Sequence, residues 1–101
     1  MSQEKKPQEV KLQIQLDDDT AQGIYANLAV INHSDAEFCI DFIFVQPQQP
    51  RAKVRSRIIL SPSHAKRLLV ALHENVRKYE QQHGTIEVGS AGGGETVGEY
   101  H

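Results

Sequence analysis

Four runs of alternating apolar and polar residues, followed by one helical pattern, constrain the fold of this 101-residue chain more than any other feature. The runs cover residues 9–16, 24–32, 37–46 and 52–60. Alternation with a period of two predicts half-buried β-strands. Because the connections are short, we expect an antiparallel meander in which each strand pairs with the next one along the chain. The residues expected on its core face are Val10, Leu12, Ile14, Leu16, Ile24, Ala26, Leu28, Val30, Phe38, Ile40, Phe42, Phe44, Val54, Ile58 and Leu60.

A single amphipathic helix is predicted after the fourth strand. Ser61 is a favourable N-cap, Pro62 is a favourable first helical residue, and Gly84 is a natural stop. Apolar residues at helical spacing form one stripe between these ends: Ala65, Leu68, Leu69, Leu72, Val76 and Tyr79. We expect this stripe to lie across the apolar face of the sheet. The predicted fold class is therefore α+β, a four-stranded antiparallel meander followed by one C-terminal helix (ββββα).

These elements predict a single domain over residues 9–84. Residues 1–8 are polar and are expected to be disordered, and residues 85–101 are expected to form a flexible, acidic, glycine-rich tail. A domain of this size has a thin core, and only 6% of the residues are aromatic. Since small folds of this kind often complete their cores with a second copy, we expect a homodimer.

Charge is distributed unevenly along the chain. Residues 1–50 carry a net charge of −5, residues 51–79 a net charge of +7, and residues 80–101 a net charge of −4. The basic block contains eight Lys or Arg residues against one acidic residue, Glu74. A block of this strength is typical of a surface for an anionic partner, whereas the overall charge of −2 is not typical of a general polyanion binder.

The sequence contains no pattern typical of a catalytic or metal site. His64 and His73 share the predicted helix, but their spacing places them on opposite sides of it. The single cysteine, Cys39, has no nearby His or glycine-rich loop to activate it, and residues 17–19 lack the ligand spacing of a calcium loop. We therefore predict a protein that is not an enzyme, with no metal, no cofactor and no small-molecule substrate.

The cysteine count and the N-terminus bear on location. A single thiol fits a reducing compartment, and the polar N-terminus is followed by no apolar stretch of signal-peptide or membrane-span length. We expect a cytoplasmic protein with no membrane partner.

The outward face of the predicted sheet carries two sets of residues. One set combines cations, an amide and an aromatic ring, a mixture that binds single-stranded nucleic acid: Lys11, Tyr25, Asn27, Lys53, Arg55 and Arg57. The other set is apolar and predicts an oligomer interface: Ala29, Ile31, Cys39, Ile43, Val45 and Ile59. Three interpretations stay open: a face buried by self-association, an oligomer that also binds nucleic acid, and a solvated face with a cross-strand pair between Asp41 and an arginine.

Two segments, GIYANLAVINHSDAEFCIDFIFVQP and AKVRSRIILSPSHAKRLLVALHENVRKYE, resemble a widespread small bacterial family catalogued only as a domain of unknown function. The resemblance covers roughly residues 9–84. It rests on the Asn-His-Ser turn, the Asp-Phe strand and the run SRIILSP.HAKRLL. It implies no particular activity.

Two further likenesses concern the order of the elements and the residue pattern of single strands. The ββββα order is similar to the repeat of the PUR and Whirly proteins, which bind single-stranded DNA or RNA. The run RSRIIL entering a helix through Ser-Pro also looks like their final strand-to-helix step. The run EVKLQIQL is similar in style to the first strand of the SecB-like export chaperones.

The first functional hypothesis is a homodimeric, single-stranded nucleic-acid-binding or nucleoid-type regulatory protein. Its alternative is a protein-interaction or oligomeric assembly module, chaperone-like, that binds no nucleic acid.

Overall fold

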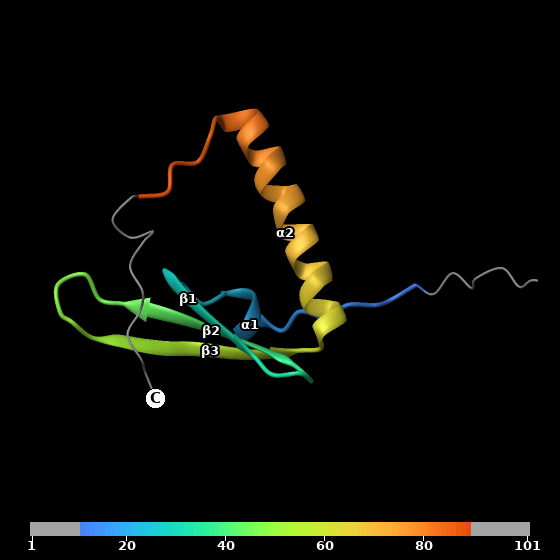
Figure 1. Cartoon of the computed structure of the whole chain (residues 1–101), viewed down its shortest axis with the longest axis horizontal. Helices are drawn as coiled ribbons and strands as arrows, with labels where there is room; N and C mark the ends of the chain where they lie inside the picture. Colours follow the sequence, from blue (N-terminus) through green and yellow to red (C-terminus); the bar gives the residue numbers. More distant parts are fainter. Residues whose placement is uncertain (1–10, 90–101) are drawn as a thin grey trace, which may run out of the picture.

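The computed structural model describes residues 11–89 and has an α+β fold (Figure 1). The elements follow in the order α1 (Asp18–Ala21), β1 (Leu28–His33), β2 (Phe38–Val45), β3 (Ala52–Leu60) and α2 (Pro62–His83). The three strands form one antiparallel sheet in the order β1-β2-β3. The predicted α+β class, the meander order of the last three strands and the C-terminal helix are confirmed.

The predicted first strand is wrong within the described residues. Residues 11–16 form no strand, and Leu12, Ile14 and Leu16 are 76%, 86% and 65% exposed. The chain then enters α1 and turns at Gly23, where φ is +77°. Alternation shows that a segment is able to form a strand, but a strand also needs a partner edge. The sheet of this chain therefore has three described strands rather than four.

A β-bulge at Arg55 sets the faces of the sheet. Ser56 pairs with Phe42 and Val54 pairs with Ile43, so Arg55 has no partner in the ladder. An extra residue in one strand shifts the alternation of every residue beyond it. Lys53 consequently lies opposite Phe44, on the face where the sequence pattern had placed the core.

The strand register defines two faces, because directly paired residues in an antiparallel sheet point to the same side. Face A carries the neighbours Val30, Asp41 and Arg57. Face B carries the paired triplets Ala29, Phe42, Ser56 and Ile31, Ile40, Ile58.

The face of the sheet that the sequence pattern predicted for the β1 residues is wrong. Alternation placed Leu28 and Val30 with the phenylalanine row, but they pair with Ile43 and Asp41 on face A. Ala29 and Ile31, expected on the outer face, lie with Phe42 and Ile40 on face B. The cause is the register between β1 and β2, in which Val30 pairs with Asp41, because a register that differs by an odd number of residues reverses the face of every side chain in the strand.

The ends of α2 are confirmed at both predicted residues. The Ser61 hydroxyl accepts a hydrogen bond from the backbone N–H of His64 at 3.2 Å, and Pro62 is the first helical residue. At the other end Gly84 has a φ of +95°, and its N–H donates to the carbonyl of Glu80 at 2.9 Å. Glycine adopts this left-handed conformation without a steric cost.

Replacing Ser61 by alanine is expected to destabilise α2 by about 1 kcal/mol, because one N-terminal N–H group loses its acceptor. Helix content, followed by far-ultraviolet circular dichroism during urea denaturation, measures the effect. Ser63→Ala is the comparison variant, since the Ser63 hydroxyl lies 3.4 Å from that of Ser61, whereas the bond to the backbone N–H of His64 is made by Ser61. Equal losses in the two variants would contradict the capping role.

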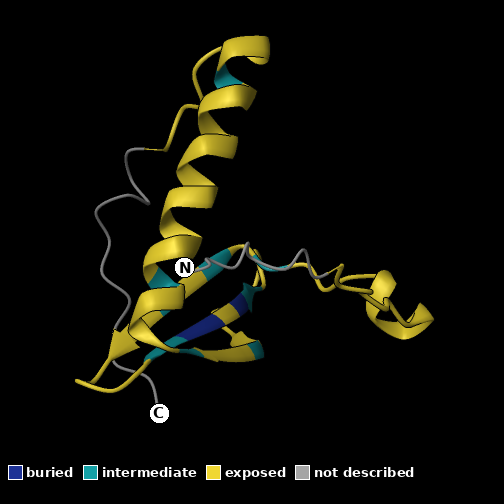
Figure 2. Ribbon diagram, turned by 90° about the vertical axis from the view of Figure 1, so that its right-hand side faces the viewer, coloured by how far each residue is buried: buried dark blue, intermediate teal, exposed yellow. Residues whose placement is uncertain are grey.

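The described chain has almost no core of its own (Figure 2). Its buried residues are Ile40, Ile43 and Asp41, and none lies in α1 or α2. Extensive contacts between described elements are confined to the sheet, and α2 rises away from it (Figure 1). The prediction that the helix stripe lies across the sheet of the same chain is therefore wrong.

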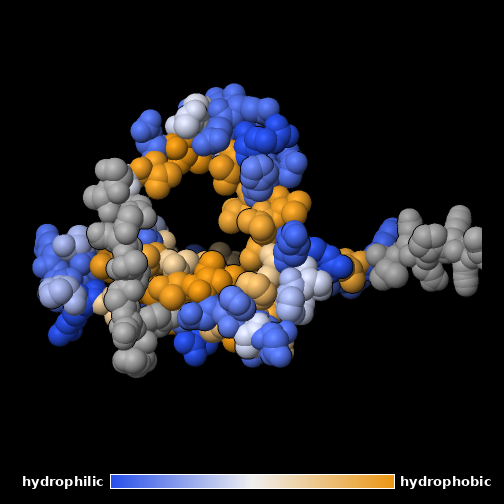
Figure 3. All heavy atoms as spheres, in the orientation of Figure 1, coloured by the Kyte–Doolittle hydropathy of each residue, from blue (hydrophilic) through white to orange (hydrophobic). Residues whose placement is uncertain are grey.

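The apolar surfaces of α2 and the sheet face one another across an open space (Figure 3). Hydrophobic side chains gather on the side of α2 toward the sheet and on the sheet surface opposite, with an open space between them (Figure 3). A helix usually owes most of its stability to packing of its apolar face rather than to intrinsic propensity. The space between α2 and the sheet is thus apolar on both sides and unfilled by the described part of this chain.

Candidate nucleic-acid interface

A cationic hollow lies where β2 ends and β3 begins. It is open, has a volume of about 480 Å³, and is lined by Phe44, Gln46, Arg51, Ala52, Lys53 and Arg55. Three of its residues are Lys or Arg, and no acidic side chain lines it. The hollow therefore combines positive charge with an aromatic ring and an amide group.

The hairpin loop and the bulge bring these side chains together. The N–H of Gln46 donates to the carbonyl of Arg51 at 3.0 Å, which closes the proline-containing loop between β2 and β3. Lys53 is the ladder partner of Phe44, and Arg55 is the bulged residue two positions further along. Without the bulge, Lys53 would point to the other face, so the local irregularity of β3 creates the cluster.

Two aromatic rings meet beside the hollow. The rings of Tyr25 and Phe44 lie edge to face, with centroids 6.0 Å apart and planes inclined by 71°. Tyr25 is exposed, whereas Phe44 is half-buried and fixed in β2. An exposed ring that is braced by a second ring offers a flat surface on which a base can stack.

Asn27, one of the predicted binding residues, has a structural use. Its side-chain amide donates to the Val45 carbonyl at 3.1 Å and its amide oxygen accepts from the Val45 N–H at 2.8 Å. Its own backbone N–H donates to the carbonyl of Ile43 at 3.0 Å. These bonds fasten the chain before β1 to the end of β2 and hold Tyr25 near Phe44, so we assign Asn27 a positioning role.

Arg57 is likewise engaged within the chain. Its guanidinium donates two hydrogen bonds to the carboxylate of Asp41, at 2.7 and 2.8 Å. The Asp41 side chain is 1% exposed and that of Arg57 is 60% exposed. The cross-strand pair between Asp41 and an arginine, one of the interpretations left open above, is therefore present on face A. A bidentate pair of this kind is stronger than an ordinary surface ion pair.

Replacing Arg57 by alanine is expected to lower the free energy of unfolding by about 2 kcal/mol, because a buried carboxylate loses its charged partner. Arg55→Ala is the matched control: it removes the same charge from the same strand and is expected to stay within about 0.5 kcal/mol of the original protein. Urea denaturation at equal protein concentration compares the two. Equal stability of the two variants would contradict the structural role of the pair.

The six predicted binding residues thus fall into three groups, one of which consists of Asn27 and Arg57, whose side chains bond within the chain. Lys53 and Arg55 line the hollow and Tyr25 lies beside its ring, while Lys11 is exposed on the extended segment before α1 and does not line it. Sequence reasoning missed four lining residues: Phe44, Gln46, Arg51 and Ala52. The Pro-Gln-Gln-Pro loop signals a tight return that would bring residues 46 and 51 together, but nothing in the alternation signals the bulge.

The predicted apolar interface does not lie on one face. Ala29 and Ile31 lie on face B, whereas the register places the other members on face A: Cys39, Ile43, Val45 and Ile59. Ile43 is buried within the chain, so its side chain offers little surface to a partner. Ile31 and Ile59 are the large members that remain exposed.

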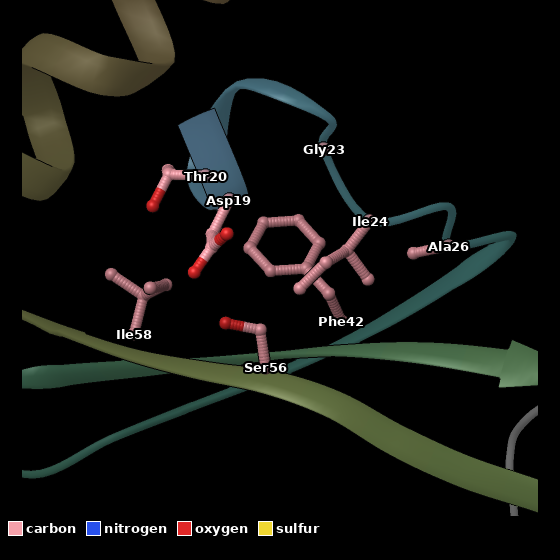
Figure 4. A pocket seen from close by; sticks show the side chains of 8 residues that line it. All are labelled: Asp19, Thr20, Gly23, Ile24, Ala26, Phe42, Ser56 and Ile58. Atoms are coloured by element: carbon pink, nitrogen blue, oxygen red, sulfur yellow. The ribbon is translucent and has the colours of Figure 1, made fainter. Parts of the chain in front are cut away.

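A second hollow of about 480 Å³ lies between the α1 segment and face B (Figure 4). The side chains of Asp19, Phe42, Ser56 and Ile58 point into it. Its lining has one carboxylate and no second acid–base group beside it, which does not form a catalytic constellation. This hollow is part of the apolar surface that α2 faces.

Two other features of residues 11–89 bear on the type of site. No three His, Cys, Asp or Glu side chains there come together in a way that could hold a metal ion. None of the helices in that part of the chain combines the length and the apolar composition needed to cross a membrane.

Comparison with known proteins identifies a family without an assigned activity. The model of the family described as "Protein of unknown function (DUF3467)" matches residues 1–88, which confirms the resemblance expected from the sequence. No curated protein and no solved structure matches the chain. The likeness to PUR, Whirly and SecB-like proteins thus gains no support from these comparisons, and the function has to be inferred from the surface.

Proposed function

We propose that this chain, which belongs to the DUF3467 family of proteins of unknown function, is a non-enzymatic homodimer that binds single-stranded nucleic acid. The observation that carries the proposal is the open hollow whose lining combines the cations Arg51, Lys53 and Arg55 with the ring of Phe44. The lone thiol of Cys39 supports a reducing compartment, and we propose the cytoplasm.

The chemistry of the hollow suits this ligand. Lys and Arg side chains contact phosphates and release condensed counterions, which supplies most sequence-independent affinity. The rings of Tyr25 and Phe44 lie at the same end of the sheet as the hollow, and they supply a surface for stacking. Bases are accessible for stacking in a single strand but not within a duplex, so we propose that the ligand is single-stranded.

A labelled single-stranded oligonucleotide, titrated by fluorescence anisotropy in low salt, tests the proposal. Binding at micromolar concentrations or tighter is expected, with weaker binding of the same sequence as a duplex. A protein that binds neither form would contradict the proposed function.

The second candidate function is an assembly module, and one specific observation favours it. Large apolar side chains stay exposed on the α2 stripe and on the side of the sheet toward it: Leu68, Leu69, Leu72, Val76, Tyr79, Ile24, Ile31, Phe42 and Ile58. With roughly 200 Å² for a fully exposed large apolar residue, their exposed fractions amount to on the order of 900 Å² per chain. A standard interface buries about 800 Å² per partner.

A second copy of the chain is the partner that fits this surface. Each copy offers both a helix stripe and an apolar sheet face, so α2 of one copy can cover face B of the other in a reciprocal, closed arrangement. The cationic hollow lies at the end of the sheet farthest from the start of α2. Because Phe44 and Lys53 of the hollow also lie on face B, dimerisation and nucleic-acid binding are compatible when the partner's α2 leaves this end of the face uncovered. The assembly alone is the alternative if no nucleic acid binds.

A further inference from the structure

Residues 11–16 form an extended, apolar segment that makes no backbone hydrogen bond with the described part of the chain. Leu12, Ile14 and Leu16 alternate with Lys11, Gln13 and Gln15, so one side of the segment is apolar and the other polar. The segment leads away from the sheet rather than alongside it (Figure 1). It has the composition and conformation of a strand without a neighbour.

The sheet offers one edge that is unprotected. β1 pairs with β2 on one side and with no described strand on the other, and its sequence LAVINH contains no Lys, Arg or Pro and no bulge. The opposite edge, β3, carries Lys53, Arg55 and Arg57 and the bulge. Proteins use charges and bulges to keep an edge from pairing, so β1 is the edge that is open to another strand.

We propose that residues 11–16 of one copy pair along the β1 edge of a second copy, and that the exchange is reciprocal. The described residues of the segment are enough to pair along the whole of β1, Leu28–His33, with backbone donors and acceptors facing one another. Leu12, Ile14 and Leu16 would join the exposed Ile31 on face B, and the apolar face would become continuous across two copies. The fourth strand of the meander is thereby supplied by the partner, by β-strand addition.

Pairing within the same chain fits the structure less well. Asn27 fastens the start of β1 to Val45, and the intervening residues 17–26 form α1 and the turn at Gly23. This connection directs the segment away from its own β1 (Figure 1). A second copy therefore provides the edge that the chain's own geometry does not.

Amide hydrogen exchange of the full chain, measured by mass spectrometry, tests the exchange of strands. In the dimer, the amides of residues 11–16 are expected to exchange on the order of 100-fold more slowly than those of residues 87–89, which lie outside any helix or strand. The protection is expected to disappear when the protein is diluted to its monomeric state. Rapid exchange at all concentrations, protection that persists in the monomer, or a chain that never dimerises would each overturn the proposal.

A pair of variants gives a second readout. Leu12→Lys combined with Ile14→Lys is expected to weaken the dimer by roughly tenfold or more, because the charges would lie on the apolar face of the exchanged strand. Ile86→Lys combined with Val88→Lys is the matched control, since both residues are exposed apolar positions outside the segment. A dimer that is weakened equally by both pairs of changes would contradict a specific role for residues 11–16.

Discussion

Replacing Leu69 by aspartate is expected to weaken the proposed dimer by at least about 100-fold, because the charge would be buried in the proposed packing of α2 on the partner's sheet. Leu69 is 61% exposed in the single chain and belongs to the apolar stripe of α2. A residue that is already exposed costs the isolated chain little when it becomes polar. A large effect therefore requires that another surface covers it. Light scattering over a dilution series measures the change in the dissociation constant.

Val70→Asp is the control for this variant. Val70 is the next residue along the same helix, is 54% exposed, and lies on the side opposite the stripe. The Val70→Asp substitution introduces the same charge into the same helix, and the dissociation constant of the proposed dimer is expected to change by no more than a few-fold. If Leu69→Asp leaves the dimer intact, or if both variants dissociate it equally, α2 does not cover the partner's sheet.

Reversing the charge of the hollow is expected to have the largest effect on nucleic-acid binding. The variant Arg51→Glu, Lys53→Glu, Arg55→Glu replaces the three cations that line the hollow by three anions. At low salt, we expect the affinity for a single-stranded oligonucleotide to fall by at least about 100-fold, because phosphate contacts are lost and repulsion is added. Anisotropy titration measures the loss, and circular dichroism checks that the helix content is unchanged.

A variant with the same change in net charge separates the hollow from the basic block as a whole. Lys66→Glu, Arg67→Glu, Lys78→Glu alters three exposed cations of α2 that do not line the hollow. Arg77 is left in place because it lies 3.8 Å from Glu74 as an ion pair. If the helix variant loses as much affinity as the hollow variant, the proposed site is wrong and only the overall charge of residues 51–79 matters.

The local signals of the sequence predict much of this fold. The strand predicted over residues 37–46 is found at Phe38–Val45, the one predicted over residues 52–60 is found at Ala52–Leu60, and α2 begins and ends at its predicted caps. These elements succeed because their signals are local: alternation, the proline-containing loop, Ser61 with Pro62, and Gly84. The predicted second strand began too early, since residues 24–27 alternate but lie before β1.

The long-range features could not be read from the pattern. Residues 11–16 alternate as clearly as any strand, but pairing depends on an edge elsewhere in the molecule. The bulge at Arg55 is invisible to alternation, and it decides which side of the sheet Lys53 occupies. The stripe of α2 was identified correctly, but amphipathicity states that a helix has an apolar side without stating which surface covers it.

Only part of the candidate site was predicted, because the site also depends on strand register and on the bulge. Lys53, Arg55 and Tyr25 were identified as binding residues from their residue types and positions, whereas Phe44 was assigned to the core because it continues the row of Phe38 and Phe42. Arg57 could not be separated from its neighbours by sequence, because its use depends on the cross-strand partner Asp41. Register, rather than composition, therefore distinguishes the residues of the hollow from those that hold the sheet together.

The most direct test of nucleic-acid binding at the hollow is the salt dependence of the affinity of the unmodified protein for a single-stranded oligonucleotide. Three phosphate contacts predict that the logarithm of the association constant falls with the logarithm of the salt concentration, with a slope of about −2 for each hollow. The variant Arg51→Glu, Lys53→Glu, Arg55→Glu is expected to lose that slope. Affinity that does not change with salt, or the absence of binding by a well-folded dimer, would contradict the nucleic-acid function and leave the assembly module as the function of this chain.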